Sequence, residues 1–429
     1  MPSQFRMPVS AAARAAAEEL AAHAASLRAA SGGRLLECFA AVPDPRDRRG
    51  IRHSLASVLA LCTAAAVCGC TAIEDMTAWI AAADQRVLAA AGCRQDGLGV
   101  CTPPHPDTVV RVFTLLSAQE VADRAGAFLA RRAAAGPVLF PVDGPGWLPA
   151  VAVDGKALRG AAGADGQVPY LLAAMLHEDA AVIAETLIGP KTNEVPALAP
   201  LLRGLDERYP LAGHVITIDA GHTVRAHATF ICAELNAHYV MTVKKNTPKL
   251  YDALDALDWD KVPVQHQTAE TGHGRHERRT IQVTAAPEEI RKLFPHARQV
   301  ALIERYVTRK VRKRKKNSRK YTTTEVRSAI TAFIITSLDA REAGPEHIAG
   351  YVRRHWRIEN QVHYVRDVTF REDFSRVRTG PRPRIMAALR NLAIGLIRQA
   401  GYRKIAATIR KIRHDPALLI AILGLHPAS

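Results

Sequence analysis

Residues 151–155 read Val-Ala-Val-Asp-Gly and residues 216–220 read Ile-Thr-Ile-Asp-Ala, so a short apolar run ends at an aspartate twice. Runs of this length and composition predict buried strands. If the two strands are neighbours, Asp154 and Asp219 lie close together at the rim of a sheet, where a ligand can reach them. The alternative for each aspartate is a turn or helix-cap residue.

Further strand and helix patterns surround these two runs. Apolar runs predict strands at 170–176, 181–187 and 238–243, and a helical period predicts helices at 194–208 and 223–235. The resulting order is strand, strand, strand, helix, strand, helix, strand. This is the element order of the RNase H-like fold, a mixed α/β sheet covered by helices, and we expect that fold class here.

The pattern changes along the chain and predicts several segments. The sheet is preceded by helical patterning and by a stretch rich in Pro and Gly, which is typical of a linker. We expect an Ala-rich flexible or helical leader at 1–30, an all-helical N-terminal domain at 31–135, a linker at 136–149, the α/β domain at 150–400 and a helical tail at 401–429.

A β-rich insertion is expected inside the α/β domain, at about 245–335. Strand patterns occupy 279–283, 299–307 and 322–335. Between the last two, residues 309–320 hold nine basic residues and no acidic one. Such a run is either a solvated, disordered loop or a segment that attracts nucleic-acid phosphates non-specifically.

The charge balance indicates a polyanionic partner. The 429 residues include 58 Lys and Arg against 41 Asp and Glu, a formal net charge of +17. Nucleic acid is the first candidate and an anionic membrane the second. No apolar run reaches the roughly 18 residues of a membrane-spanning helix, so we expect no membrane partner. The N-terminus lacks the pattern of a secretory signal.

The seven cysteines include no Cys-x-x-Cys pair. Their spacing does not match the common closed zinc sites, although a zinc site remains an alternative. Reduced, buried thiols in a cytoplasmic protein are the interpretation that we favour.

Glu359 is a third candidate carboxylate. It lies in a stretch with a helical pattern, and His363 and Arg366 follow it by four and seven residues. On a regular helix these three side chains share one face. A carboxylate beside cations suits both a metal and a phosphate. The alternative is a surface stripe of salt bridges.

Neighbouring carboxylates need a compensating cation. Mg²⁺ is a hard ion that takes carboxylate and water oxygens, and Mn²⁺ is the expected substitute. Two such ions about 4 Å apart can activate an attacking oxygen and stabilise a leaving oxygen in phosphodiester chemistry. The sequence therefore predicts a site for two divalent ions.

Five sequence blocks follow one another along the chain: DGKALRG at 154–160, TIDAGHT at 217–223, HYVMTVKKN at 238–246, GHGRHERR at 272–279 and HWRIENQVHYVRDVTFREDFSR at 355–376. In this order they resemble the blocks of bacterial insertion-sequence transposases of the DDE type. The stretch at 35–80 also resembles the helical domain that precedes the catalytic domain in one branch of that family.

The resemblance implies an RNase H-like catalytic domain with a β-rich insertion before the third acid. It assigns the catalytic, metal-binding triad to Asp154, Asp219 and Glu359, with gaps of 219 − 154 = 65 and 359 − 219 = 140 residues. The second gap is long enough for the insertion. Arg366 stands where related transposases often have Lys.

The implied activity is metal-dependent cleavage of double-stranded DNA at the ends of the element, followed by transfer of the freed 3′-hydroxyl into target DNA. A homo-oligomer on DNA, associated with the nucleoid, is expected. One alternative is a metal-dependent nuclease of the same fold without strand transfer. Another is a non-catalytic DNA-binding regulator, which predicts loss of at least one acid.

Basic residues near the acids are expected to position DNA. In the N-terminal domain they are expected to bind the element ends, unless that domain mainly mediates dimerisation. Trp356 either stacks on a displaced base or packs in the core. The expected DNA-binding residues are Lys156, Arg159, Lys244, Lys245, His355 and Arg366 near the acids, and Arg46, Arg48, Arg49 and Arg52 in the N-terminal domain.

Overall fold

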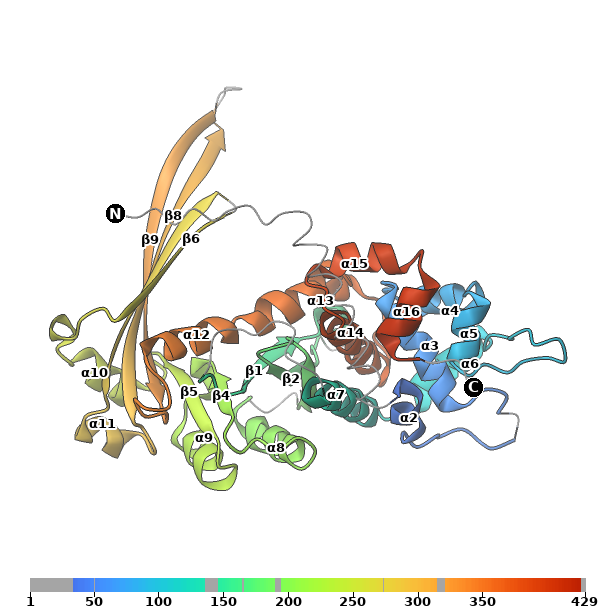
Figure 1. Ribbon diagram of the computed structural model, residues 1–429, viewed down its shortest axis with the longest axis horizontal. Helices are drawn as coiled ribbons and strands as arrows, with labels where there is room; N and C mark the ends of the chain where they lie inside the picture. Colours follow the sequence, from blue (N-terminus) through green and yellow to red (C-terminus); the bar gives the residue numbers. More distant parts are fainter. Residues whose placement is uncertain are drawn as a thin grey trace.

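The computed structural model describes residues 34–49, 51–135, 146–163, 166–189, 194–272, 274–314 and 321–425. A cluster of helices lies at one end of the molecule, a sheet crosses the middle, and a long β-hairpin projects at the other end (Figure 1).

The N-terminal part of the described chain is helical. Its central helix is buried along its whole length, because all of its side chains are apolar or small. Ser54 caps that helix by accepting a hydrogen bond from the Ser57 amide. The six helices here are α2 (Leu35–Ala40), α3 (Leu55–Val67), α4 (Ile73–Ala81), α5 (Gln85–Ala90), α6 (Pro106–Leu115) and α7 (Ala118–Ala135).

A nine-stranded mixed sheet has the order β3-β2-β1-β4-β5-β9-β8-β7-β6. β1 is antiparallel to β2 and parallel to β4, and β5 is parallel to β4. The predicted mixed α/β sheet is therefore confirmed. The strands are β1 (Ala150–Ala157), β2 (Tyr170–Leu176), β3 (Val182–Ile188), β4 (Val215–Ile218), β5 (His238–Val243), β6 (His266–Gly272), β7 (Arg275–Ala285), β8 (Gln299–Arg314) and β9 (Tyr321–Thr336).

In the chain, the strands β6 to β9 come after β5 and before the C-terminal helices. The three strands predicted in this region are present, and each is longer than its apolar pattern. The inner end of β9 pairs with β5, from Val240 opposite Thr336 to Val243 opposite Phe333. The outer parts of β8 and β9 extend away from the body as a hairpin (Figure 1). One sheet thus joins the body to the hairpin.

Helices pack on the sheet, and the C-terminal part of the described chain is helical. The longer ones are α8 (Val195–Asp206), α10 (Pro248–Asp255), α12 (Pro345–His355), α14 (Arg382–Gln399), α15 (Ile405–Ile412) and α16 (Pro416–Leu423). The shorter ones are α9 (Arg225–Thr229), α11 (Glu288–Leu293) and α13 (Tyr364–Val368), the π-helical turns η3 (Phe230–Glu234) and η5 (Ile358–His363), and the 3₁₀ turns η1 (Arg159–Ala161), η2 (Ala220–His222), η4 (Trp259–Lys261) and η6 (Glu372–Phe374).

The helical N-terminal part packs directly on the sheet. Gly126 of α7 lies against the backbone carbonyl of Ile183 in β3, so closely that a β-carbon at position 126 would collide with it. Gly395 of α14 is covered in the same way by the side chain of Leu129. These two glycines allow α7 to lie between α14 and the sheet.

Candidate active site

Asp154 and Asp219 follow paired positions of neighbouring parallel strands. Val153 of β1 pairs with Ile218 of β4, and the next residue in each strand is the aspartate. The strand β4 ends at this point, whereas β1 continues to Ala157 along β2. The prediction that β1 ends at Asp154 is therefore wrong. Because β4 stops, one side of β1 is uncovered at Asp154, which leaves room for groups from another element.

The segment from α12 to α13 supplies those groups. Ile358 and Val362 of η5 pack with Ala152 and Ala173 on the face of the sheet, in one apolar cluster. The two alanines let the helical segment approach closely. In this π-helical turn the Tyr364 amide bonds to the Glu359 carbonyl. Turns of this kind are frequent at functional sites.

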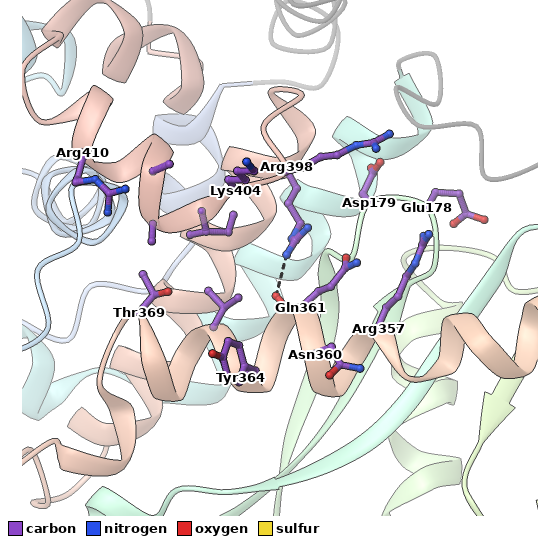
Figure 2. Close-up of a pocket in the computed structure, with 15 residues that line it drawn as sticks. Glu178, Asp179, Arg357, Asn360, Gln361, Tyr364, Thr369, Arg398, Lys404 and Arg410 are labelled. Atoms are coloured by element: carbon purple, nitrogen blue, oxygen red, sulfur yellow. Dashed lines mark hydrogen bonds between the residues drawn. The ribbon is translucent and has the colours of Figure 1, made fainter. Parts of the chain in front are cut away.

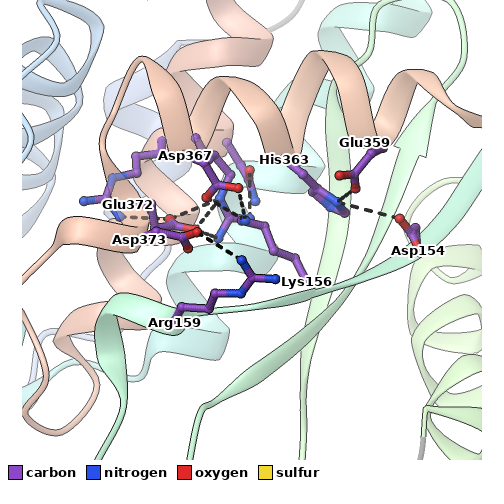
Figure 3. Close-up of polar contacts among 11 residues, drawn as sticks. Asp154, Lys156, Arg159, Glu359, His363, Asp367, Glu372 and Asp373 are labelled. Carbon is purple, nitrogen blue, oxygen red and sulfur yellow. Dashed lines mark hydrogen bonds and ion pairs between the residues drawn. The ribbon is translucent and has the colours of Figure 1, made fainter. Parts of the chain in front are cut away.

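Asp154, Glu359 and His363 form a compact cluster (Figure 3). The Nδ1 atom of His363 lies 3.0 Å from Oε2 of Glu359 and 3.7 Å from Oδ2 of Asp154. One ligand atom from each residue lies within 4.8 Å of the other two. Asp154 and Glu359 are 359 − 154 = 205 residues apart in the chain. The fold thus brings two of the three predicted acids to one point.

The cluster holds more negative charge than its surroundings balance. Burial raises the pKa of Asp154, and Glu359 and Glu194 raise it further, while His363 lowers it. The hydrogen bond from His363 lowers the pKa of Glu359. The Glu359 side chain is 57% exposed, so the cluster is open to solvent on that side.

Asp219 is not part of this compact cluster. Its Oδ1 atom accepts a hydrogen bond from the Ala220 amide at 2.6 Å and lies 3.3 Å from Nζ of Lys244. The carboxylate therefore caps η2. Its backbone is next to that of Asp154, but the full convergence of three carboxylates stays a prediction.

Glu194 and Gly155 complete the surroundings of Asp154. The His222 side chain bonds to Glu194 at 3.0 Å and lowers its pKa. A β-carbon on Gly155 would collide with the Tyr170 ring and would lie 3.0 Å from the Glu194 carboxyl carbon. The glycine after Asp154 thus lets these groups approach the acid.

The residues of the cluster fit a divalent cation. Carboxylate oxygens suit Mg²⁺ and Mn²⁺, and an imidazole nitrogen is also accepted by Mn²⁺. Asp154, Glu359 and His363 offer such donor atoms. Among the described residues, these three side chains form the cluster whose ligand atoms lie close enough together to hold a metal ion. Two carboxylates that face one another favour a cation between them.

Lys156 and Arg159 differ in how far they reach solvent. Lys156 is buried, and both oxygens of Asp367 lie 2.7 Å from its ammonium group. Its charge is balanced inside the protein, so the DNA contact of Lys156 stays a prediction. The Arg159 side chain is 75% exposed and lies 3.6 Å from Asp373.

Arg366 is also buried, and its contact with DNA stays a prediction. Its guanidinium bonds to Glu372, with Nη2 at 2.8 Å from Oε1. Arg390 of α14 bonds to the other oxygen of Glu372, also at 2.8 Å. A buried carboxylate shared by two arginines ties the end of α13 to α14.

His355 is buried beneath the sheet face. Its Nδ1 lies 3.1 Å from the Thr217 hydroxyl, which in turn lies 2.9 Å from His177. Burial lowers the pKa of His355 to about 4. The enclosed imidazole does not reach solvent in this conformation, and its DNA contact stays a prediction. The neighbouring Trp356 is exposed, which excludes packing in the core.

The N-terminal arginines divide in the same way. Arg46 pairs with Asp44 and donates to the His53 carbonyl, and only 9% of its side chain is exposed. These groups hold its side chain, and its DNA contact stays a prediction. Arg48, Arg49 and Arg52 are exposed. Lys244 and Lys245, which directly follow β5, are exposed as well. Part of the basic run, 315–320, lies outside the described residues.

Two residues of the site were not assigned from the sequence. His363 was recognised as a neighbour of Glu359, but not as a member of the cluster. Its spacing of four residues was the available signal. Glu194 was considered only as the start of a helix. Nothing in its local pattern indicates an approach to Asp154, because that approach depends on how α8 packs.

Comparisons with known proteins agree along most of the chain. Residues 36–129 match the family described as "DDE_Tnp_1-associated", and residues 148–396 match the "Transposase DDE domain". Among the described residues, no helix has both the length and the apolar character needed to cross a membrane.

Similar proteins include the "Putative transposase YncI" of Escherichia coli O157:H7, which is 26% identical over 90% of this chain and 92% of its own length. The "H repeat-associated putative transposase YhhI" of Escherichia coli K12 is 24% identical over 91% of this chain and 98% of its own length. A piggyBac transposase synaptic complex with hairpin DNA aligns with a TM-score of 0.41 at 11% identity, over 98% of this chain and 83% of that chain. The matched residues 148–396 span more than half of the chain, which belongs to the family of bacterial DDE-type transposases.

Proposed function

We propose that this transposase cleaves double-stranded DNA at the ends of its element and transfers the freed 3′-hydroxyl into target DNA. The observation that carries the proposal is the meeting of Asp154 and Glu359 with His363, although 205 residues separate the two acids (359 − 154). A surface salt-bridge stripe, the alternative for Glu359, does not explain a contact with a strand so distant in the chain.

The five strands around the acids support an RNase H-like catalytic core. Their order is β3-β2-β1-β4-β5, with β1 to β3 antiparallel and β1, β4 and β5 parallel. Along the chain these strands and helices follow the order that the sequence predicts for this fold. The strands β6 to β9 then form the insertion before the third acid.

Asp154, Asp219 and Glu359 are proposed to hold two Mg²⁺ ions. Bound divalent ions would activate an attacking oxygen and stabilise the leaving oxygen of a phosphodiester. His363 holds the Glu359 carboxylate beside Asp154, because its Nδ1 lies within hydrogen-bonding distance of Glu359. Lys244 lies beside Asp219 and adds a positive charge at the rim.

Exposed basic residues around the acids and in the N-terminal part are the proposed DNA contacts. Arginine suits this task because its planar group holds a phosphate through two hydrogen bonds. The residues that remain as proposed contacts are Arg159, Lys244, Lys245, Arg48, Arg49 and Arg52.

The test is excision and integration from a plasmid that carries the gene with its native flanking DNA. The Asp154→Asn variant is compared with Asp255→Asn, a matched change on α10. We expect loss of nicking and of joined products with Asp154→Asn alone. Normal nicking by Asp154→Asn would remove this residue from the site.

The same assay separates two activities. Joined donor–target products support a transposase, whereas cleavage without joining would assign a nuclease. Assembly of several copies on DNA is a separate expectation, which light scattering of the protein–DNA complex measures.

A further inference from the structure

A basic cavity lies on the side of the catalytic helical segment that faces α14 and α15. Its volume is about 680 Å³ (Figure 2). Asn360, Gln361 and Tyr364 line it, and they alternate along the chain with Glu359 and His363 of the acidic cluster. The same segment therefore presents Glu359 and His363 to the acidic cluster and a second, different surface to the cavity.

The cavity carries an excess of positive charge. Two acidic residues, Glu178 and Asp179, line it together with five basic ones. Burial raises the pKa of Glu178 to about 7, so its negative charge is incomplete at neutral pH. The basic residues are Arg357, Arg398, Arg403, Lys404 and Arg410.

One arginine, Arg398, lies at the base of the cavity and away from solvent. Arg398 is 9% exposed, and its Nε has no hydrogen-bond partner among the described residues. Its Nη2 donates to the Gln361 carbonyl at 3.1 Å. Burial, together with the nearby charge of Arg357, lowers the pKa of Arg398 to about 10. An anion in the cavity would offset the repulsion between the positive charges of Arg398 and Arg357.

Two cations at the rim are accessible. Lys404 and Arg410 are exposed, and no ion pair joins either of them to a carboxylate in the part of the chain that the structure describes. The unused donor of the buried Arg398 and the exposed charges of Lys404 and Arg410 favour an anion that enters from solvent and remains partly outside. A phosphate within a longer chain has this form.

We propose that this cavity binds a backbone phosphate of the DNA strand that lies in the active site. The inference rests on the proposed function, because Asn360 directly follows Glu359 and Tyr364 directly follows His363. The acidic cluster and the cavity share one helical segment, so a DNA strand held at the cluster can extend along that segment towards the cavity. The binding contact is to phosphate, so it is independent of base sequence.

The experiment measures duplex DNA binding by the full chain in EDTA as a function of salt concentration. The variants are Lys404→Gln and Arg410→Gln, and the control is Arg291→Gln on α11, at the other end of the molecule (Figure 1). A phosphate contact contributes about one unit to the slope of log affinity against log salt. We expect each cavity variant to make the slope less steep by about one unit relative to the control. Slopes equal to that of Arg291→Gln would overturn the proposal.

A second arm distinguishes a DNA phosphate from a small phosphorylated ligand. Sodium pyrophosphate is titrated calorimetrically into the wild-type protein and the Arg410→Gln variant. Pyrophosphate binding that depends on Arg410, with an unchanged DNA slope, would assign the cavity to a small ligand and overturn the DNA assignment. Circular dichroism melting checks that each variant is folded.

Binding in EDTA on a Glu359→Gln background keeps the two proposals separate. A changed slope without any cleavage by the wild-type protein would reject the proposed function alone. Normal wild-type cleavage with unchanged slopes would reject the cavity assignment alone.

Discussion

Two charged clusters each take a residue from the segment that contains η5 and α13, and they differ in how their charge is balanced. The open cluster, Asp154, Glu359 and His363, contains two carboxylates and an exposed side. The closed cluster, Arg366, Glu372 and Arg390, places one buried carboxylate between two guanidinium groups.

The difference separates charge that holds the fold from charge that meets a ligand. In the closed cluster each charge has a buried partner, so its loss leaves an uncompensated ion. In the open cluster two carboxylates face one imidazole, and the proposed divalent ions would complete the charge balance. Residues of the same type thus have different roles within a few helical turns.

The largest expected effect is on cleavage, from Glu359→Gln in the open cluster. Loss of a metal ligand removes several kcal/mol of transition-state stabilisation, which corresponds to a rate loss on the order of 10³-fold. The melting temperature should stay close to that of the wild type. Glu288→Gln, on exposed α11, is the matched control for the plasmid nicking assay. Nicking by Glu359→Gln at the control rate would end the proposed distinction between the clusters.

The corresponding change in the closed cluster, Glu372→Gln, should act on stability instead. Removal of one partner of a buried ion pair costs about 3–5 kcal/mol. We expect a lower urea midpoint, while DNA cleavage per folded molecule is retained. A variant as stable as the wild type would show that the closed cluster does not hold α13 against α14.

The pH dependence sharpens the same point. Burial alone raises the pKa of Glu372, but Arg366 and Arg390 hold it at about 2, below its ordinary value of 4.5. The contribution of Glu372 to stability is therefore complete above about pH 4.5 and is lost as the pH falls towards 2. Thermal melts of the wild type and Glu372→Gln should converge over this interval. A constant difference between them would contradict the assignment.

A smaller effect is expected from His363→Gln. Groups that orient metal ligands typically change metal affinity by about 10- to 100-fold. Mn²⁺ titration followed by electron paramagnetic resonance measures this without any DNA substrate. His347→Gln, on α12, is the control. Equal Mn²⁺ affinity for the two variants would limit His363 to a packing role.

The smallest effect concerns Glu178, at the edge of the basic cavity. Burial raises its pKa to about 7, so the folded state is progressively disfavoured as the pH rises from about 4.5 to 7. Glu178→Gln carries no charge to bury. Its melting temperature should match the wild type near pH 4 and exceed it by a few degrees at pH 8. A lower melting temperature at pH 8 would contradict this view of the cavity.

Much of the sheet was predictable because its strands are continuous apolar runs. Val151 to Val153 and Ile216 to Ile218 indicate buried strands whatever their neighbours. Arg366 could not be placed in this way. The expectation of a shared face with Glu359 assumed a regular helix, whereas the π-helical turn at Ile358–His363 rotates every following side chain.

Long-range contacts account for the other features that the sequence did not predict. Glu372 reaches Arg366 because the chain turns through Arg371, which has a φ of 51°. The partner of Lys156 is 211 residues away in the chain. The cavity likewise joins the turn at Glu178 to α14 and α15. No local pattern encodes such pairings, since each depends on how separate elements pack.

The separation of Asp154 from Glu359 also has a consequence for synthesis on the ribosome. Domains generally form from the N-terminus as the chain emerges. The strands β1 to β5 are made before the hairpin of β8 and β9, and η5 follows only after both. A nascent chain can therefore carry its first two acids for much of its translation without the third. The complete acidic cluster arises late, after exposed basic residues such as Arg48, Arg159 and Lys244 have already been synthesised.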